Sequence, residues 1–169
     1  MNKDRAITCC FTGHRSIPKN DLFAVCEQLQ HAIRVLYEDG YRHFVAGGAL
    51  GFDTLAARAV LALKPHLEGI TLTLVLPCAD QADAWEEKDR AEYGRIKSLA
   101  DEVVCLAPAY FDGCMQKRNQ AMVDASSACI AYLTRSRSGA GQTVRMAEKA
   151  GHRILNTAPK RDEKSSDFI

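Results

Sequence analysis

The sequence predicts an α/β fold of three layers, in which helices cover both faces of a mostly parallel sheet of about six strands. Short apolar runs alternate with longer amphipathic segments along the whole chain. Glycine and proline mark many of the boundaries between these segments. Because strand and helix alternate, crossover connections are expected, and these give parallel sheets buried on both faces.

Six short runs have the length and composition of buried strands. Residues 70–76, for example, read ITLTLVL, which is rich in β-branched side chains, and Pro77 follows them. The expected strands, in chain order, are residues 6–11, 42–46, 70–76, 102–106, 128–133 and 152–156.

Five longer segments carry apolar residues at helical spacing. In the first, apolar residues recur every three or four positions from Leu22 to Leu36, between Pro18 and Gly40. The expected helices are residues 20–39, 53–63, 86–100, 114–125 and 142–150. The chain of 169 residues is close to the ~150 residues of one typical domain. We therefore expect a single domain over residues 1–157 and a polar tail over 158–169.

Composition excludes several classes of protein. The 22 Lys and Arg residues nearly balance the 21 Asp and Glu residues, so the formal net charge is +1. This balance argues against nucleic-acid binding by overall charge. No apolar stretch approaches the ~20 residues of a membrane helix, and residues 6–11 are too short for a secretory signal. The seven cysteines lack a CxxC motif, which favours reduced thiols in the cytoplasm, with no metal and no cofactor.

The loops that follow the strands are where a ligand is expected. In open parallel sheets, ligands bind at the carboxyl ends of the strands, near the point where the strand order reverses. The first such loop contains Gly13, which permits a tight turn or a close approach to a ligand. His14 and Arg15 follow it, and an arginine can bind a phosphate with two parallel hydrogen bonds. The alternative is an ordinary turn with two solvated side chains.

The second loop, residues 47–53, reads GGALGFD and leads from a strand into a helix. Gly47, Gly48 and Gly51 would expose backbone N–H groups beside the start of a helix, which is a cradle for a phosphate. Asp53 suits either a helix cap or a contact with the ligand. A tight turn without a ligand is the alternative for the glycines.

Three further segments complete the candidate site. After the third strand, Asp80 or Gln81 could bond a sugar hydroxyl. Trp85 could stack on a base, although packing in a helix is the alternative for it. Arg118 and Asn119 lie near the start of a helix and would face an anion. The loop before the last helix offers small residues and hydroxyls that could bind a phosphate, namely Ser138, Gly139, Gly141 and Thr143. Together these loops predict a pocket for a phosphorylated, nucleotide-like small molecule.

The order of these motifs is similar to that of a known family. The motifs are FTGHR, GGALGFD, an LPC strand end followed by Trp85, RNQAMVD and SGAGQT. In this order they resemble the YpsA-like branch of the SLOG superfamily, over about residues 6–157. That superfamily includes DNA-processing protein A (Smf/DprA) and the Lonely Guy (LOG) phosphoribohydrolases. The resemblance implies a Rossmann-like fold that binds nucleotides or their derivatives, and by analogy a homodimer.

The two relatives imply sharper alternatives. LOG enzymes cleave the N-glycosidic bond of nucleoside 5′-monophosphates and carry Arg-Lys-x-x-Met and Pro-Gly-Gly-x-Gly-Thr-x-x-Glu. Here Arg118 matches the first motif, whereas Asn119 replaces its lysine and Arg145 occupies the position of the glutamate. An arginine opposes the positive charge that builds up on the ribose, so Asp53 or Glu148 would have to replace that glutamate.

DNA-processing protein A binds single-stranded DNA, which requires a positive groove and stacking aromatic side chains. A positive patch could form here from Arg15, Lys117, Arg118, Arg135 and Arg137, but the net charge is only +1 and the aromatic content is 7%. The main prediction is therefore a cytoplasmic protein that binds a nucleotide or nucleotide-derived ligand. A sensor of that ligand is one protein of this kind. Hydrolysis of nucleoside monophosphates is the second prediction, and binding of single-stranded DNA the third.

Overall fold

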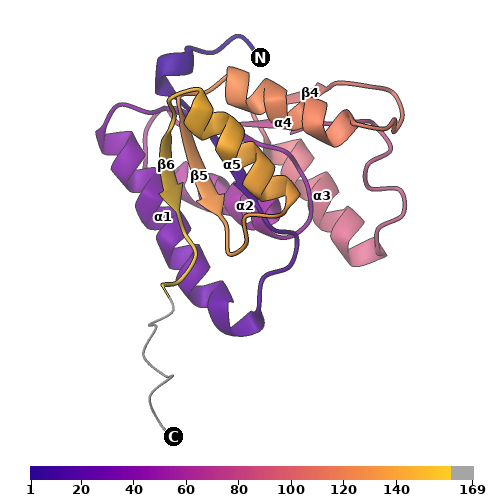
Figure 1. The fold of residues 1–169 in the computed structure, drawn as a ribbon, viewed down its shortest axis with the longest axis horizontal. Helices are drawn as coiled ribbons and strands as arrows, with labels where there is room; N and C mark the ends of the chain where they lie inside the picture. The colour runs from indigo at the N-terminus through magenta and orange to yellow at the C-terminus, as the bar shows by residue number, and fades with distance from the viewer. Residues whose placement is uncertain (161–169) are drawn as a thin grey trace, which may run out of the picture.

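Six parallel strands form one sheet in the computed structural model of the protein, which describes residues 1–160 (Figure 1). In chain order they are β1 (Thr8–Gly13), β2 (His43–Ala46), β3 (Thr71–Leu76), β4 (Glu102–Cys105), β5 (Ala128–Tyr132) and β6 (Arg153–Asn156). Their order across the sheet is β4-β3-β2-β1-β5-β6, and every pair is parallel. The predicted fold class is therefore confirmed.

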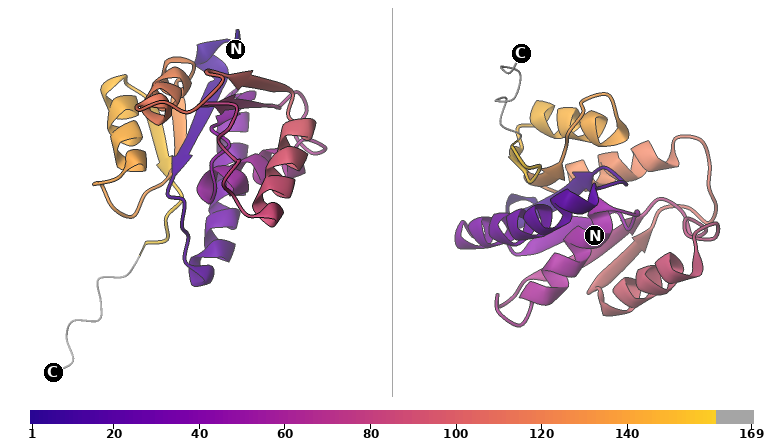
Figure 2. Two further views of the ribbon diagram at one scale, coloured as in Figure 1. Left: turned by 90° about the vertical axis from the view of Figure 1, so that its right-hand side faces the viewer. Right: turned by 90° about the horizontal axis from the view of Figure 1, so that it is seen from below.

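Five helices cover the two faces of the sheet. They are α1 (Leu22–Glu38), α2 (Phe52–Leu63), α3 (Glu87–Leu99), α4 (Cys114–Asp124) and α5 (Gly139–Lys149). Helix α2 packs between α1 and α3 on one face, and α4 packs against α5 on the other (Figure 2). The helix layer changes face after β4, because the chain there crosses to the other side of β1 and right-handed crossovers are the rule.

The core consists of two clusters, one on each face of the sheet. Successive residues of a strand point to opposite faces, so Cys9 lies in the cluster beneath α1 and α2, while Cys10 lies in the cluster beneath α4 and α5. Both thiols are fully buried. Burial on both faces explains why apolar residues occupy successive positions in the central strands, as in β5.

The ends of several elements differ from the prediction. Residues Arg5–Ile7 form a short 3-10 helix ahead of β1, because the Asp4 carboxylate accepts a hydrogen bond from the Ala6 N–H. Helix α5 begins three residues earlier than expected, since the Ser138 hydroxyl caps it by accepting the Gly141 N–H. The predicted cap position of Asp53 was wrong, because Gly51 precedes α2 and Asp53 lies in its first turn.

The chain continues to pair with the sheet beyond β6. The Thr157 N–H donates to the Ala131 carbonyl, and Ala158 packs against the core beneath α1. Most of the predicted tail, residues 161–169, lies outside the described residues. Within residues 1–160, none of the helices combines the length and apolarity that crossing a bilayer requires.

Candidate functional site

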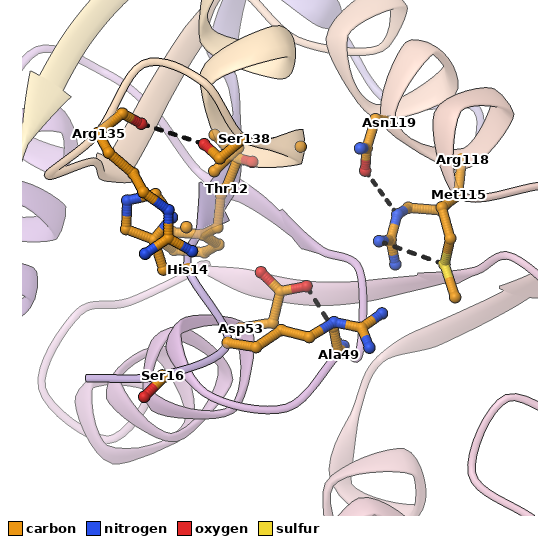
Figure 3. Close-up of a pocket in the computed structure, with 15 residues that line it drawn as sticks. Thr12, His14, Ser16, Ala49, Asp53, Met115, Arg118, Asn119, Arg135 and Ser138 are labelled. Atoms are coloured by element: carbon orange, nitrogen blue, oxygen red, sulfur yellow. Dashed lines mark hydrogen bonds between the residues drawn. The ribbon is translucent and has the colours of Figure 1, made fainter. Parts of the chain in front are cut away.

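A cavity of about 340 Å³ opens at the carboxyl ends of β1 and β5, where the strand order reverses. We call it the switch-point cavity (Figure 3). Its walls come from β1 and the following loop, the start of α2, helix α4 and the β5–α5 loop. The lining residues are Phe11, Thr12, Gly13, His14, Arg15, Ser16, Ala49, Asp53, Met115, Arg118, Asn119, Arg135, Ser138, Gly139 and Ala140. This is the position at which open α/β sheets bind their ligands.

Arg118 extends from α4 into the cavity wall and is only 6% exposed. Its guanidinium donates to the Gly47 carbonyl at 2.5 Å and to the side-chain oxygen of Asn119 at 2.7 Å. Burial lowers the pKa of Arg118, and the negative charge of Asp53 opposes that shift. A Cβ atom at position 47 would lie 2.3 Å from the guanidinium, so glycine there makes room for Arg118.

Asp53 is a buried carboxyl group in the first turn of α2. Its Oδ2 atom accepts a hydrogen bond from the Ala49 N–H at 3.2 Å. Burial raises the pKa of Asp53, while the charges of Arg118 and Arg15 and the backbone N–H groups of Ala49 and Gly47 act in the opposite direction. Asp53 is the one acidic side chain among the described residues that line the cavity.

His14 contacts three other segments of the site. Its Nε2 atom accepts the Thr134 N–H at 3.0 Å, which places the ring proton on Nδ1 in the neutral form. Its carbonyl accepts the Phe52 N–H at the start of α2, and its ring packs edge-on against Tyr132 of β5. Burial, and then the positive charge of Arg135, lower the pKa of His14. The neutral ring is therefore favoured.

The start of α5 forms the wall opposite α2. Ser138 donates its hydroxyl proton to the Arg135 carbonyl at 3.1 Å and accepts the Gly141 N–H at 3.0 Å. Gly139 and Ala140, the first two residues of the helix, line the cavity. The first turn of a helix presents N–H groups and partial positive charge, which favour an anion. Exposed Arg15 and Arg135 add two positive charges at the mouth.

The structure brings only part of the predicted set into the cavity. Residues that line it are Gly13, His14, Arg15, Asp53, Arg118, Asn119, Ser138 and Gly139. Residues that do not line it are Gly47, Gly48, Gly51, Asp80, Trp85, Gly141 and Thr143. For both groups, contact with a ligand stays a prediction.

The residues outside the cavity have partners within the protein. Asp80 accepts the Tyr110 N–H at 2.9 Å, and Trp85 packs edge-on against Tyr93. A Cβ atom at Gly141 would lie 2.0 Å from the Ser136 carbonyl oxygen. The Thr143 hydroxyl donates to the Gly139 carbonyl at 3.0 Å. Close packing of the backbone thus accounts for part of the glycine pattern.

Several lining residues were not predicted. Thr12 and Ser16 flank the first motif, and Met115 lies one turn before Arg118 on α4. Their residue types carry no signal for binding, so the sequence could identify them only by their proximity to the motifs. The positive charges of Arg135 and Arg137 were both expected to contribute, but only Arg135 lines the cavity.

Comparisons of sequence place the chain among bacterial relatives. The model of the YspA SLOG family matches residues 9–154. The uncharacterized SPbeta prophage-derived protein YoqJ of Bacillus subtilis is 33% identical over 158 residues, covering 83% of this chain and 87% of YoqJ. A UPF0398 protein of Bacillus cereus strain AH187 is 25% identical over 154 residues, covering 86% of this chain and 84% of that protein.

Comparisons of structure identify the same fold in DNA processing protein A. The protein from Streptococcus pneumoniae superposes with a TM-score of 0.66 at 18% identity, over 94% of this chain. The chain spans about half of that protein, 52% of its length. DNA processing protein A from Helicobacter pylori, whose structure was described for its single-stranded DNA binding mode, gives a TM-score of 0.65 at 18% identity, over 95% of this chain and 69% of that one. The predicted resemblance is confirmed, and the chain belongs to the YspA SLOG family.

Proposed function

We propose that the protein binds a nucleotide or nucleotide-derived ligand, with its phosphate in the switch-point cavity. The observation that carries this proposal is the convergence of Arg15, Arg118 and Arg135 on one cavity at the start of α5. These arginines come from three separate segments, and Asp53 neutralises one of their three charges. The remaining positive charge and the helix start both favour a phosphate.

The cavity also offers groups for the rest of a nucleotide. Its volume of about 340 Å³ lies at the lower end of the range for small-molecule sites, roughly 300–1,000 Å³. The Asp53 carboxylate can accept hydrogen bonds from ribose hydroxyls, and neutral His14 can donate from Nδ1. A homodimer and a cytoplasmic location stay predictions that accompany this proposal.

Replacing Arg135 by alanine is expected to weaken nucleotide binding by about tenfold or more, because a hydrogen bond to a charged group contributes about 1.5–3 kcal/mol. Arg137→Ala is the matched control, since Arg137 lies in the same exposed loop and outside the cavity. Calorimetric titration with adenosine and guanosine mono- and diphosphates measures the effect. Native mass spectrometry with the same panel gives the number of ligands bound per chain.

Equal losses in the two variants would contradict a specific phosphate site. If the panel fails to bind and a single-stranded oligonucleotide binds with affinity that falls steeply with salt, nucleic-acid binding takes its place. The similarity to the H. pylori DNA-binding protein supports that alternative. The exposed arginines at this edge of the sheet would then act by charge alone, and both variants would weaken binding alike.

Hydrolysis of nucleoside monophosphates is a second candidate, and the buried carboxyl group in the cavity favours it. Arg145, at the position of the LOG glutamate, donates to the Ser136 carbonyl at 2.8 Å and lies outside the cavity. Asp53 is therefore the carboxylate available to stabilise a positively charged ribose.

If the protein is such an enzyme, Asp53→Asn should slow the release of free base by about 100-fold or more. Chromatography of nucleoside monophosphates incubated with each protein measures this rate. Wild-type protein that releases base no faster than Asp53→Asn would exclude this mechanism. It would leave ligand binding as the function of the cavity.

A further inference from the structure

A second cavity, of about 320 Å³, lies beside the switch-point cavity. We call it the side cavity. It is bounded by the β1–α1 connection, the start of α1, the start of α2 and the first turn of α3. Arg15 lines both cavities, so the two meet at this residue.

The backbone fixes Arg15 at the junction. Gly51 precedes α2 with a φ of +78°, and a Cβ atom there would lie 2.2 Å from the Arg15 carbonyl oxygen. Next to this contact, the Phe52 N–H donates to the His14 carbonyl at 3.2 Å. The positive charge of Arg15 opposes the burial that raises the pKa of Asp53, and it adds to the burial that lowers the pKa of Arg118. Arg15 therefore lines the switch-point cavity, where its charge acts on Asp53 and Arg118, and also borders the side cavity.

The walls of the side cavity differ in chemistry from those of the first. They include four aliphatic side chains, Ile17, Leu22, Leu50 and Leu55. Leu22 is 37% exposed, which leaves apolar surface open to solvent at the mouth of the cavity.

Two polar side chains of the side cavity already have partners. The Thr54 hydroxyl donates to the Ala49 carbonyl at 3.1 Å, and Arg58 pairs with Glu92 at 2.7 Å. Lys88 and Asp89 have opposite charges that offset each other. The side cavity is thus suited to a flat apolar ring rather than to a second phosphate.

We infer that the ligand spans both cavities, with phosphate at the three arginines and an aromatic base against the aliphatic walls of the side cavity. Under the proposed function, the phosphate and ribose of one nucleotide already occupy the switch-point cavity, so a base in the side cavity belongs to a second unit beyond that phosphate. The ligand class is then a dinucleotide, or a nucleotide extended by a second aromatic group, rather than a mononucleotide. This inference rests on the proposed function, because it requires the phosphate to occupy the switch-point cavity. Arg15 at the junction would contact the phosphate that links the two halves.

The test compares two neighbouring substitutions on α1. Leu22→Trp fills the side cavity, whereas Phe23→Trp is the matched control, because Phe23 is 75% exposed and does not line the cavity. The probes are adenosine monophosphate and the dinucleotide NAD⁺, titrated by calorimetry. We expect wild-type protein to bind NAD⁺ about tenfold more tightly than adenosine monophosphate. Leu22→Trp should remove that advantage and change the affinity for adenosine monophosphate by less than about twofold.

Thermal unfolding of both variants confirms that each is folded before the comparison. Equal affinity for the two probes in wild-type protein, or equal losses for both probes in Leu22→Trp, would overturn the extended ligand. The proposed function would still stand if Arg135→Ala weakened both probes. Failure of both probes and of the whole nucleotide panel to bind would overturn the proposed function and this inference together.

Discussion

Replacing Arg118 by methionine is expected to abolish nucleotide binding and to lower the free energy of unfolding by about 3–5 kcal/mol at neutral pH. Methionine keeps an unbranched apolar stem but lacks the guanidinium and its charge. The variant removes the larger of the two positive charges that act on the buried Asp53 carboxylate, and it leaves the Gly47 carbonyl without the Arg118 donor. Chemical denaturation and nucleotide titration of the same preparation measure both effects.

The destabilisation should depend on pH with a definite sign. Burial already raises the pKa of Asp53 in the wild-type protein, and loss of the Arg118 charge raises it further. A carboxyl group whose pKa is higher in the folded state binds its proton more tightly there, so folding is penalised only once pH rises above the unfolded pKa. The penalty grows as pH rises through the folded pKa. The destabilisation should therefore be smallest near the ordinary pKa of 3.8 and largest at neutral pH.

The double variant Arg118→Met with Asp53→Asn is the control for this mechanism. Asparagine retains an acceptor for the Ala49 N–H but carries no charge. The double variant should recover part of the lost stability at neutral pH and lose the pH dependence. A destabilisation that is the same at both ends of the pH range, and that the second substitution leaves unchanged, would contradict the role of the buried charge.

Gly51→Ala should have the second largest effect, a loss of about 3 kcal/mol or more in the free energy of unfolding. Its φ of +78° is strained for a residue with a Cβ atom, and that atom would lie 2.2 Å from a backbone oxygen of Arg15. Because backbone cannot rotate away as a side chain can, the β1–α1 connection must shift. Displacement of Arg15 should also weaken nucleotide binding by about tenfold.

Gly40→Ala is the control that distinguishes backbone strain at a positive φ from a steric clash of the added Cβ atom. Gly40 has a φ of +96°, and a Cβ atom there would meet no neighbouring atom within 4 Å, so alanine at this position introduces strain alone. Its expected loss is about 1–2 kcal/mol, with nucleotide affinity unchanged. Thermal and chemical unfolding of the two variants measure the difference. Equal losses would show that the contact with Arg15 contributes nothing.

The alternation of strands and helices could be predicted because each type of element has its own apolar spacing. The ends of elements were harder to predict, because they depend on single hydrogen bonds. The run Gly139-Ala140-Gly141 has the composition of a loop, yet the Ser138 cap allows α5 to begin there. For Trp85, packing in a helix was the alternative to stacking on a base; the residue lies just before α3 and contacts Tyr93 of that helix.

The candidate site was predictable as a set of loops but not as a set of contacts. All the loops lie at one edge because the strands are parallel, which the pattern implied. Asp80 follows β3, whereas the switch-point cavity lies over β1 and β5. The order of strands across the sheet decides which loops meet, and local patterns carry no information about that order. The close packing of Gly47 against Arg118 likewise joins residues that are distant in the sequence.

The central position of β1 has a consequence for how the chain folds. Cys10 pairs with Val45 of β2 on one side and with Cys129 of β5 on the other, more than a hundred residues later. Contacts this distant form slowly, because a long loop must close before they are gained. While the chain is being synthesised, the first strand therefore keeps one unpaired edge until β5 (Ala128–Tyr132) has emerged. Such an edge can recruit other extended chains, so the interval between synthesis of β1 and of β5 is when this protein is most prone to aggregate.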